Sequence, residues 1–159
     1  MQKTILFALL LGMVIGAVIG VYAYILLWHG SLGEGKGTVE QYTASVTTFH
    51  IDLGTIKPGQ IATGTDSFTV TSETNSILHV MINTSALQDT FLQSWTVTLT
   101  YPGGSDQITS SNPEKVVLIN IPGGSDPTTI EVQIEVQATD EVYGSAQVVI
   151  PLEGELTYG

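Results

Sequence analysis

Hydrophobic and polar residues change their pattern twice along this chain. Residues 5–28 contain no charged side chain, and residues 29–38 contain four glycines in ten positions. From Ala44 onward apolar residues recur at every second position, which is typical of half-buried β-strands. The pattern divides the chain into an apolar amino-terminal segment, a glycine-rich connection and a β-rich domain over residues 44–159.

The alternation in the last part predicts at least seven short strands. They cover residues 49–53, 68–71, 77–82, 95–101, 116–121, 130–137 and 146–158. Turn sequences separate them, such as Pro58-Gly59 and the Pro-Gly-Gly-Ser-Asp run that occurs at both 102–106 and 122–126. Because no long helical pattern alternates with the strands, we expect an all-β fold, an antiparallel jelly-roll-like β-sandwich.

Two stretches depart from this alternation. Residues 84–93 place Leu87, Phe91 and Leu92 at helical spacing behind Ser85, which predicts one or two helical turns that Ser85 caps. Residues 116–121 are apolar at both odd and even positions, and therefore on both faces of a strand. This predicts a central strand or one whose second face is covered.

The amino-terminal segment has the order of a secretory leader. A single positive charge, Lys3, precedes the apolar run, and Val21 and Ala23 stand at positions −3 and −1 of a small-residue cleavage site. We therefore expect residues 1–23 to be a signal peptide that is cut after Ala23. The alternative is a retained helix: 24 apolar residues reach roughly 36 Å, enough to span a bilayer.

Cleavage after Ala23 exposes five large apolar residues at the new amino terminus. They are Tyr24, Ile25, Leu26, Leu27 and Trp28. An extended strand of this length covers about 17 Å and is apolar on both faces, and burying it is worth on the order of 10 kcal/mol as an upper estimate. The glycine-rich connection that completes residues 24–43 is typical of a flexible linker. It permits the strand to reach a neighbouring molecule or to fold back on its own domain.

Charge narrows the range of partners. The chain has four lysines, no arginine and fifteen acidic residues, with a net charge of −11. Such a polyanion has no means of neutralising phosphates, which excludes nucleic acid and anionic membrane surfaces as ligands. Cysteine is absent, so no disulfide or thiolate metal site can form. An acidic, Thr-, Ser- and Gly-rich composition suits an exposed extracellular surface.

Two phrases resemble a family of surface proteins. Residues 51–60, Ile-Asp-Leu-Gly-Thr-Ile-Lys-Pro-Gly-Gln, followed by Asp-Ser-Phe-Thr-Val-Thr at 66–71, are similar to the TasA/camelysin-like secreted β-sandwich proteins. That family includes archaeal bundling-pilus subunits. Residues 20–24 also resemble the end of the family's leader, although Ile25-Leu26-Leu27 replaces its usual continuation. The resemblance implies a filament subunit whose amino-terminal strand enters the next sandwich by strand addition.

Candidate chemistry outside the amino terminus is sparse. His50 and Asp52 share a strand face, and His79 is expected to point outward, but no zinc triad or nucleophile elbow occurs. We therefore expect no enzyme activity, no catalytic or metal site and no cofactor. Asp106 and Asp126 end the two repeated turns, where either calcium binding or turn chemistry explains them. Asn83 begins the one N-glycosylation sequon.

The sequence thus predicts a structural subunit of an extracellular pilus or biofilm-matrix fibre, which polymerises by donor-strand complementation. Tyr24–Trp28 would fill an acceptor groove lined by Val116–Ile121 and one neighbouring strand. The expected partners are further copies of the chain and neighbouring filaments, with membrane contact during export or through a retained helix. The alternative hypothesis is a monomeric, membrane-anchored surface domain that binds a ligand or protein partner.

Overall fold

The computed structural model describes residues 30–31, 38–39, 42–141 and 144–159, and these residues form strands, turns and extended segments without a helix. No helix suited to spanning a membrane occurs among them. The predicted leader, 1–23, and the predicted donor strand, 24–28, lie outside the described residues.

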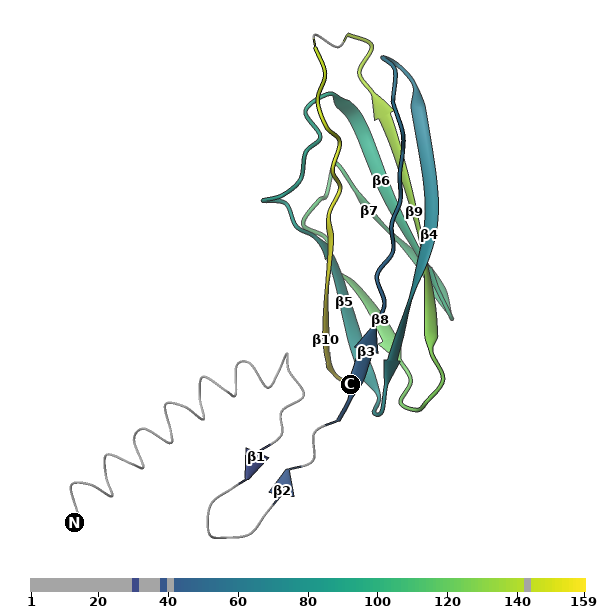
Figure 1. Ribbon diagram of the computed structural model, residues 1–159, viewed down its shortest axis with the longest axis vertical. Coiled ribbons are helices and arrows are strands. Elements are labelled where there is room, and N and C mark those ends of the chain that lie inside the picture. The colour runs from purple at the N-terminus through teal and green to yellow at the C-terminus, as the bar shows by residue number, and fades with distance from the viewer. Residues whose placement is uncertain (1–29, 32–37, 40–41, 142–143) are drawn as a thin grey trace, which may run out of the picture.

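The domain consists of two antiparallel sheets packed face to face (Figure 1). The larger sheet has the order β3-β4-β9-β6-β7 and the smaller one the order β10-β5-β8. The larger contains β3 (Ala44–Val46), β4 (Ile61–Ser72), β9 (Thr128–Ala138), β6 (Leu92–Tyr101) and β7 (Gly104–Thr109). The smaller contains β10 (Leu152–Tyr158), β5 (Ser76–Ile82) and β8 (Val117–Ile121). The predicted antiparallel sandwich is confirmed.

The period-two pattern explains why the two sheets stack. On β9, Ile130, Val132 and Val136 are fully buried, whereas the intervening Glu131 and Glu135 are exposed. Burying one face of each sheet against the other removes the apolar side chains from water, and the polar side chains remain on the outer faces. Trp95 lies among these buried residues, and its indole Nε1–H donates a hydrogen bond to Asp89 at 3.0 Å.

The two copies of Pro-Gly-Gly-Ser-Asp have different structural roles. The first forms a tight hairpin between β6 and β7 in one sheet, with Gly103 at a φ of 95°. The second carries the chain from β8 in the smaller sheet to β9 in the larger one. Its Gly123 lies against the backbone of Thr74, where an added Cβ would stand 2.7 Å from the carbonyl carbon.

The predicted helical turns at residues 84–93 are wrong. Asn83 forms the turn there, because its side-chain oxygen accepts hydrogen bonds from the Ser85 hydroxyl and the Ala86 N–H. Gln88 then pairs with Val149 through two backbone hydrogen bonds of 2.9 Å. Backbone pairing with a distant segment therefore replaces the local helix that the spacing of apolar residues indicated.

The prediction that residues 116–121 form a central or doubly covered strand is also wrong. β8 is an edge strand of the smaller sheet, and its burial alternates along the strand. The side chain of Leu118 is 56% exposed on the outer face. Periodicity alone cannot separate a covered strand from an edge strand that carries an exposed apolar residue.

Two predicted strands are extended segments for part of their length. Phe49, Ile51 and Leu53 pack against the core as the alternation predicts, but residues 47–57 form no strand. Residues 145–151 likewise approach the core without a ladder, and β10 begins only at Leu152. Figure 1 shows both segments on the side of the sandwich where β3 and β10 lie.

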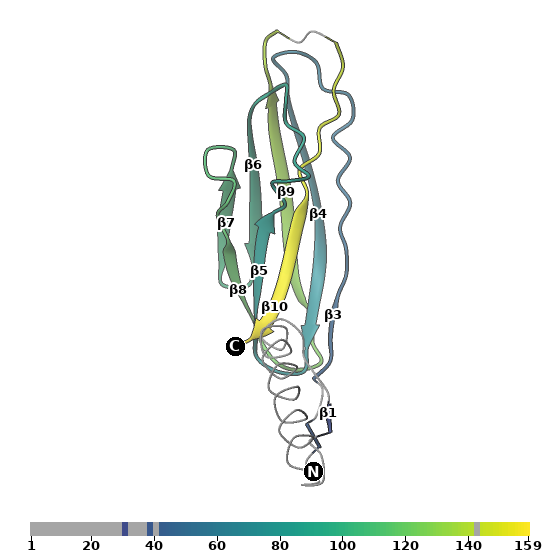
Figure 2. The ribbon, with the colours of Figure 1, turned by 90° about the vertical axis from the view of Figure 1, so that its left-hand side faces the viewer.

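Part of the predicted linker is paired. β1 (Gly30–Ser31) and β2 (Thr38–Val39) form a short antiparallel ladder. This ladder lies beyond the β3 end of the sandwich and outside both sheets (Figures 1 and 2).

Candidate strand-acceptor groove

An apolar groove of about 400 Å³ opens between the two sheets on the side of β3 and β10. Phe68 of the larger sheet and Leu78 and Val80 of the smaller sheet form its floor. The remaining lining residues form two walls, one from the end of β3 and the residues after it and one from β10 and the residues before it. These wall residues are Val46, Thr47, Thr48 and Phe49 on one side and Ile150, Pro151, Leu152, Glu153, Gly154 and Leu156 on the other.

The β10 wall presents a free strand edge. Among the described strands β10 pairs only with β5, at the end of its sheet. Two hydrogen bonds flank that ladder: the Asn83 N–H donates to the Pro151 carbonyl, and the Gly159 N–H donates to the Asn75 carbonyl. Because bonded pairs alternate in an antiparallel ladder, Leu152, Gly154 and Leu156 direct their N–H and C=O groups away from β5.

The same three residues are the inward positions of β10, and Gly154 has no side chain there. Leu152 and Leu156 pack against the core, opposite Ile82 and Leu78 of β5. Glu153 and Glu155 alternate with them on the exposed outer face. An added strand next to β10 would therefore gain backbone hydrogen bonds and place every second side chain in the groove.

The opposite wall belongs to a longer segment, residues 43–53, and two carboxylates, one on β4 and one directly after it, bind the backbone of this segment. Asp66 accepts a 2.7 Å hydrogen bond from the His50 backbone N–H, and this bond is the largest cause of the lowered pKa of Asp66. Glu73 accepts a 3.0 Å hydrogen bond from the Thr43 N–H, and hydrogen bonds from Thr43 lower the pKa of Glu73. Both bonds favour the charged carboxylate, so both hold the wall in place at neutral pH.

Aromatic contacts mark the floor and one end of the groove. The rings of Phe49 and Phe68 lie 6.0 Å apart, where the wall meets the floor. Tyr42 contacts Tyr158 edge to face at 5.8 Å, at the carboxyl end of β10. The amino-terminal extension therefore joins the domain beside one end of the groove.

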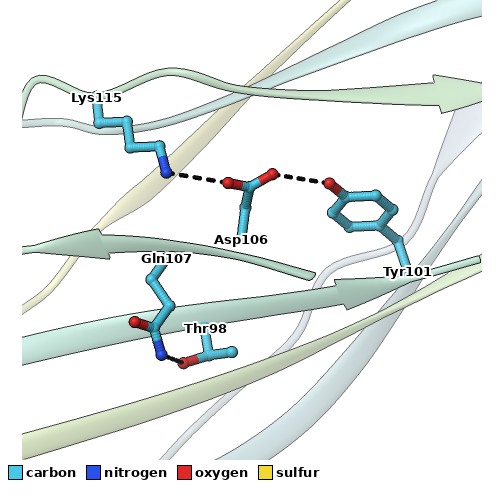
Figure 3. A network of polar contacts seen from close by, with 5 residues as sticks. All are labelled: Thr98, Tyr101, Asp106, Gln107 and Lys115. Carbon is cyan, nitrogen blue, oxygen red and sulfur yellow. Dashed lines mark hydrogen bonds and ion pairs between the residues drawn. The ribbon is translucent and has the colours of Figure 1, made fainter. Parts of the chain in front are cut away.

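The other long side of the sandwich is closed by polar contacts. Lys115, which precedes β8, lies 3.0 Å from one oxygen of Asp106 on β7, and the Tyr101 hydroxyl donates to the other at 2.8 Å (Figure 3). Lys115 first and Tyr101 second lower the pKa of Asp106, and the bond to Asp106 raises the pKa of Tyr101. This network links the edges of the two sheets on that side.

The sequence-predicted site residues do not converge. Asp52 accepts a hydrogen bond from the Gly54 N–H, and His79 is half-buried on the outer face of β5, where Nε2 lies 3.1 Å from the Thr157 hydroxyl. Asp106 is engaged by Lys115, and Asp126 is separate from it in the second repeated turn. No group of three or more metal-ligating side chains forms among the described residues.

Asn83, the predicted glycan acceptor, lies beside the start of β10 in the groove wall. Its side-chain nitrogen donates a hydrogen bond to Glu153, a lining residue of the groove, and its oxygen accepts from Ser85. Glycosylation of Asn83 stays a prediction.

The residues predicted to line an acceptor groove, Val116–Ile121, lie elsewhere in the sandwich. They do not line the observed groove: β8 lies at the far edge of the smaller sheet, and β10 lies at the groove. The sequence does hold a signal for the observed site, the run Leu152-x-Gly154-x-Leu156, where glycine interrupts an apolar alternation. Comparison with models of known protein families and with curated proteins gave no match.

Proposed function

We propose that this protein is a structural subunit of an extracellular filament, in which residues 24–28 of one copy fill the groove of the next. The observation that carries the proposal is the open groove beside the free edge of β10. An exposed strand edge next to apolar side chains is a template for adding another strand. The TasA/camelysin-like resemblance of residues 51–71 agrees with this assignment.

Length and chemistry match between the donor and the groove. Leu152–Leu156 and Tyr24–Trp28 are both five residues long, about 17 Å when extended. The donor is wholly apolar, and apolar side chains form the floor of the groove. The donor therefore has the dimensions and the polarity of the missing strand.

The position of the β1–β2 ladder supports insertion into a neighbour. Residue 30 begins β1, outside the two sheets of its own sandwich (Figure 1). In the sequence the proposed donor ends two residues before this point, so the proposal has the chain leave its own sandwich here and enter a second molecule. A contact of donor to groove that repeats without closing into a ring produces an open fibre.

The proposal is tested by removing the donor. A chain that starts at Tyr24 is expected to form fibres in electron micrographs, whereas a chain that starts at Gly30 should remain monomeric with the same β-sheet circular dichroism. Long fibres from the Gly30 start would contradict the proposal.

The intact mass of native subunits tests the cleavage on which the donor depends. We expect this mass to lack residues 1–23. Retention of those residues would favour the membrane-anchored monomer instead.

A further inference from the structure

Gly154 stands at the centre of the β10 wall without a structural need for glycine. It lies in the strand interior, opposite Val80, and its φ is not in the left-handed region. An added Cβ would meet Leu78 Cδ1 at 3.4 Å and the His79 carbonyl oxygen at 3.9 Å, which are ordinary contacts. Glycine inside a strand weakens it and often marks a close approach of another chain.

Other glycines in the domain have reasons within the fold. Gly64 is covered by Ile51, whose Cγ2 would stand 2.3 Å from an added Cβ, and Gly103 has a positive φ in a hairpin turn. Neither reason applies to Gly154. The missing side chain leaves a gap in the groove wall between Leu152 and Leu156, which are both inward-facing.

Building on the proposed function, we propose that Gly154 sets the register of the donor strand by accepting the side chain of Leu26. The inward positions of β10 are Leu152, Gly154 and Leu156, and residues directly opposite on adjacent strands point to the same face. A donor that turns alternate residues inward buries either residues 24, 26 and 28 or residues 25 and 27. The first choice buries two aromatic rings as well as a leucine, and thus more apolar area.

The assignment does not depend on the direction of the donor strand. Leu26 is the middle residue of the donor, and Gly154 is the middle inward residue of the wall. Whether the donor runs parallel or antiparallel to β10, these two residues face each other. Tyr24 and Trp28 then lie beside the two flanking leucines, in one order or the other.

The test first fills the gap with a larger side chain at Gly154 and then makes room again with a smaller side chain at Leu26 of the donor. In the chain that starts at Tyr24, Gly154→Leu is expected to abolish sedimentable fibres, whereas Glu155→Leu, the matched control on the exposed outer face of β10, should retain them. Adding Leu26→Ala to Gly154→Leu should restore fibres. Rescue by Tyr24→Ala or Trp28→Ala in place of Leu26→Ala would overturn the register.

A donor-side pair keeps the proposal testable if Gly154→Leu lowers the folded fraction seen by circular dichroism. Leu26→Trp should be too large for the gap and abolish fibres, whereas Ile25→Trp, on the opposite face, should lower the fibre yield much less. Equal assembly of these two variants would overturn the register.

The outcome separates this proposal from the one on which it rests. Normal fibres from Gly154→Leu, together with a monomeric Gly30-start chain, would overturn the register and leave strand exchange standing. Fibres from the Gly30-start chain would overturn both.

Discussion

Glycine occurs at positions 123 and 154 of this domain for two different reasons. Gly123 lies against backbone, since an added Cβ would stand 2.7 Å from Thr74 C and 2.8 Å from Asn75 N. Its N–H also donates to the Asn75 side-chain oxygen at 2.8 Å. Gly154 has neither constraint. The fold requires the first glycine, whereas the proposed register uses the space that the second leaves in the groove wall.

Replacing Gly123 with alanine is expected to destabilise the domain. The new methyl group must displace the backbone of the turn before β5, an overpacking that costs about 1–3 kcal/mol. Thermal unfolding of Gly123→Ala measures the loss, and Gly154→Ala is the matched control, expected to melt at or slightly above the parent temperature. Equal melting of both variants would show that the turn accommodates a side chain.

At the scale of elements, the wall segment, residues 43–53, is held by the β3–β4 ladder at its start and by a side-chain hydrogen bond farther on. It continues beyond β3 without a ladder, and the bond from the His50 N–H to Asp66 holds it against β4. The lowered pKa of Asp66 gives this bond a pH dependence. Its stabilisation is complete above the ordinary aspartate pKa of about 3.9 and is lost as the pH falls through the lower folded value.

Asp66→Ala should therefore release the wall while the sheets stay folded. We expect faster hydrogen exchange of the His50 amide at neutral pH, with little change at the amides of β9, and no further acceleration as the pH falls below 4 once intrinsic exchange rates are corrected. Asp126→Ala, in a loop away from the groove, is the control and should leave the His50 amide protected. Unchanged protection in Asp66→Ala would contradict this account of the wall.

The elements that the sequence predicted correctly are those whose outer face is polar. Glu131, Gln133 and Glu135 alternate with buried aliphatic residues, so the pattern defined β9. On β8 the exposed outer face carries the apolar Leu118, so polar and apolar residues do not alternate there. The sequence pattern of this edge strand is therefore that of a central strand. The periodicity of apolar residues does not determine the order of strands in a sheet. For this reason the groove was predicted beside Val116–Ile121 and not beside β10.

The site was predictable only in part for the same reason. The repeated turns are local patterns, and so is the proposed donor, which stays a prediction. A groove needs two segments distant in sequence, residues 46–49 and 150–156, to meet across a gap. Directly after the first of these segments, the His50 N–H donates a hydrogen bond to Asp66, which alternation alone marks as an inward position of β4. Such a contact depends on the register in which the strands pair, and no local sequence motif indicates it.

At the scale of the whole molecule, the two long sides of the sandwich differ. Lys115, Asp106 and Tyr101 link the sheets on one side (Figure 3), whereas the other side has the groove and the free edge of β10. An open edge of this kind is an aggregation hazard unless something pairs with it. The proposed strand exchange would turn that hazard into a specific contact between copies of the chain.

Disulfide trapping tests this contact most directly, because the native chain has no cysteine. Five double variants combine Gly154→Cys with Tyr24→Cys, Ile25→Cys, Leu26→Cys, Leu27→Cys or Trp28→Cys, and their oxidised fibres are run on a non-reducing gel. We expect a ladder of covalent dimers, trimers and longer chains, strongest for Leu26→Cys. Monomers with an internal disulfide, or fibres without any disulfide, would contradict insertion of the donor into a neighbouring groove.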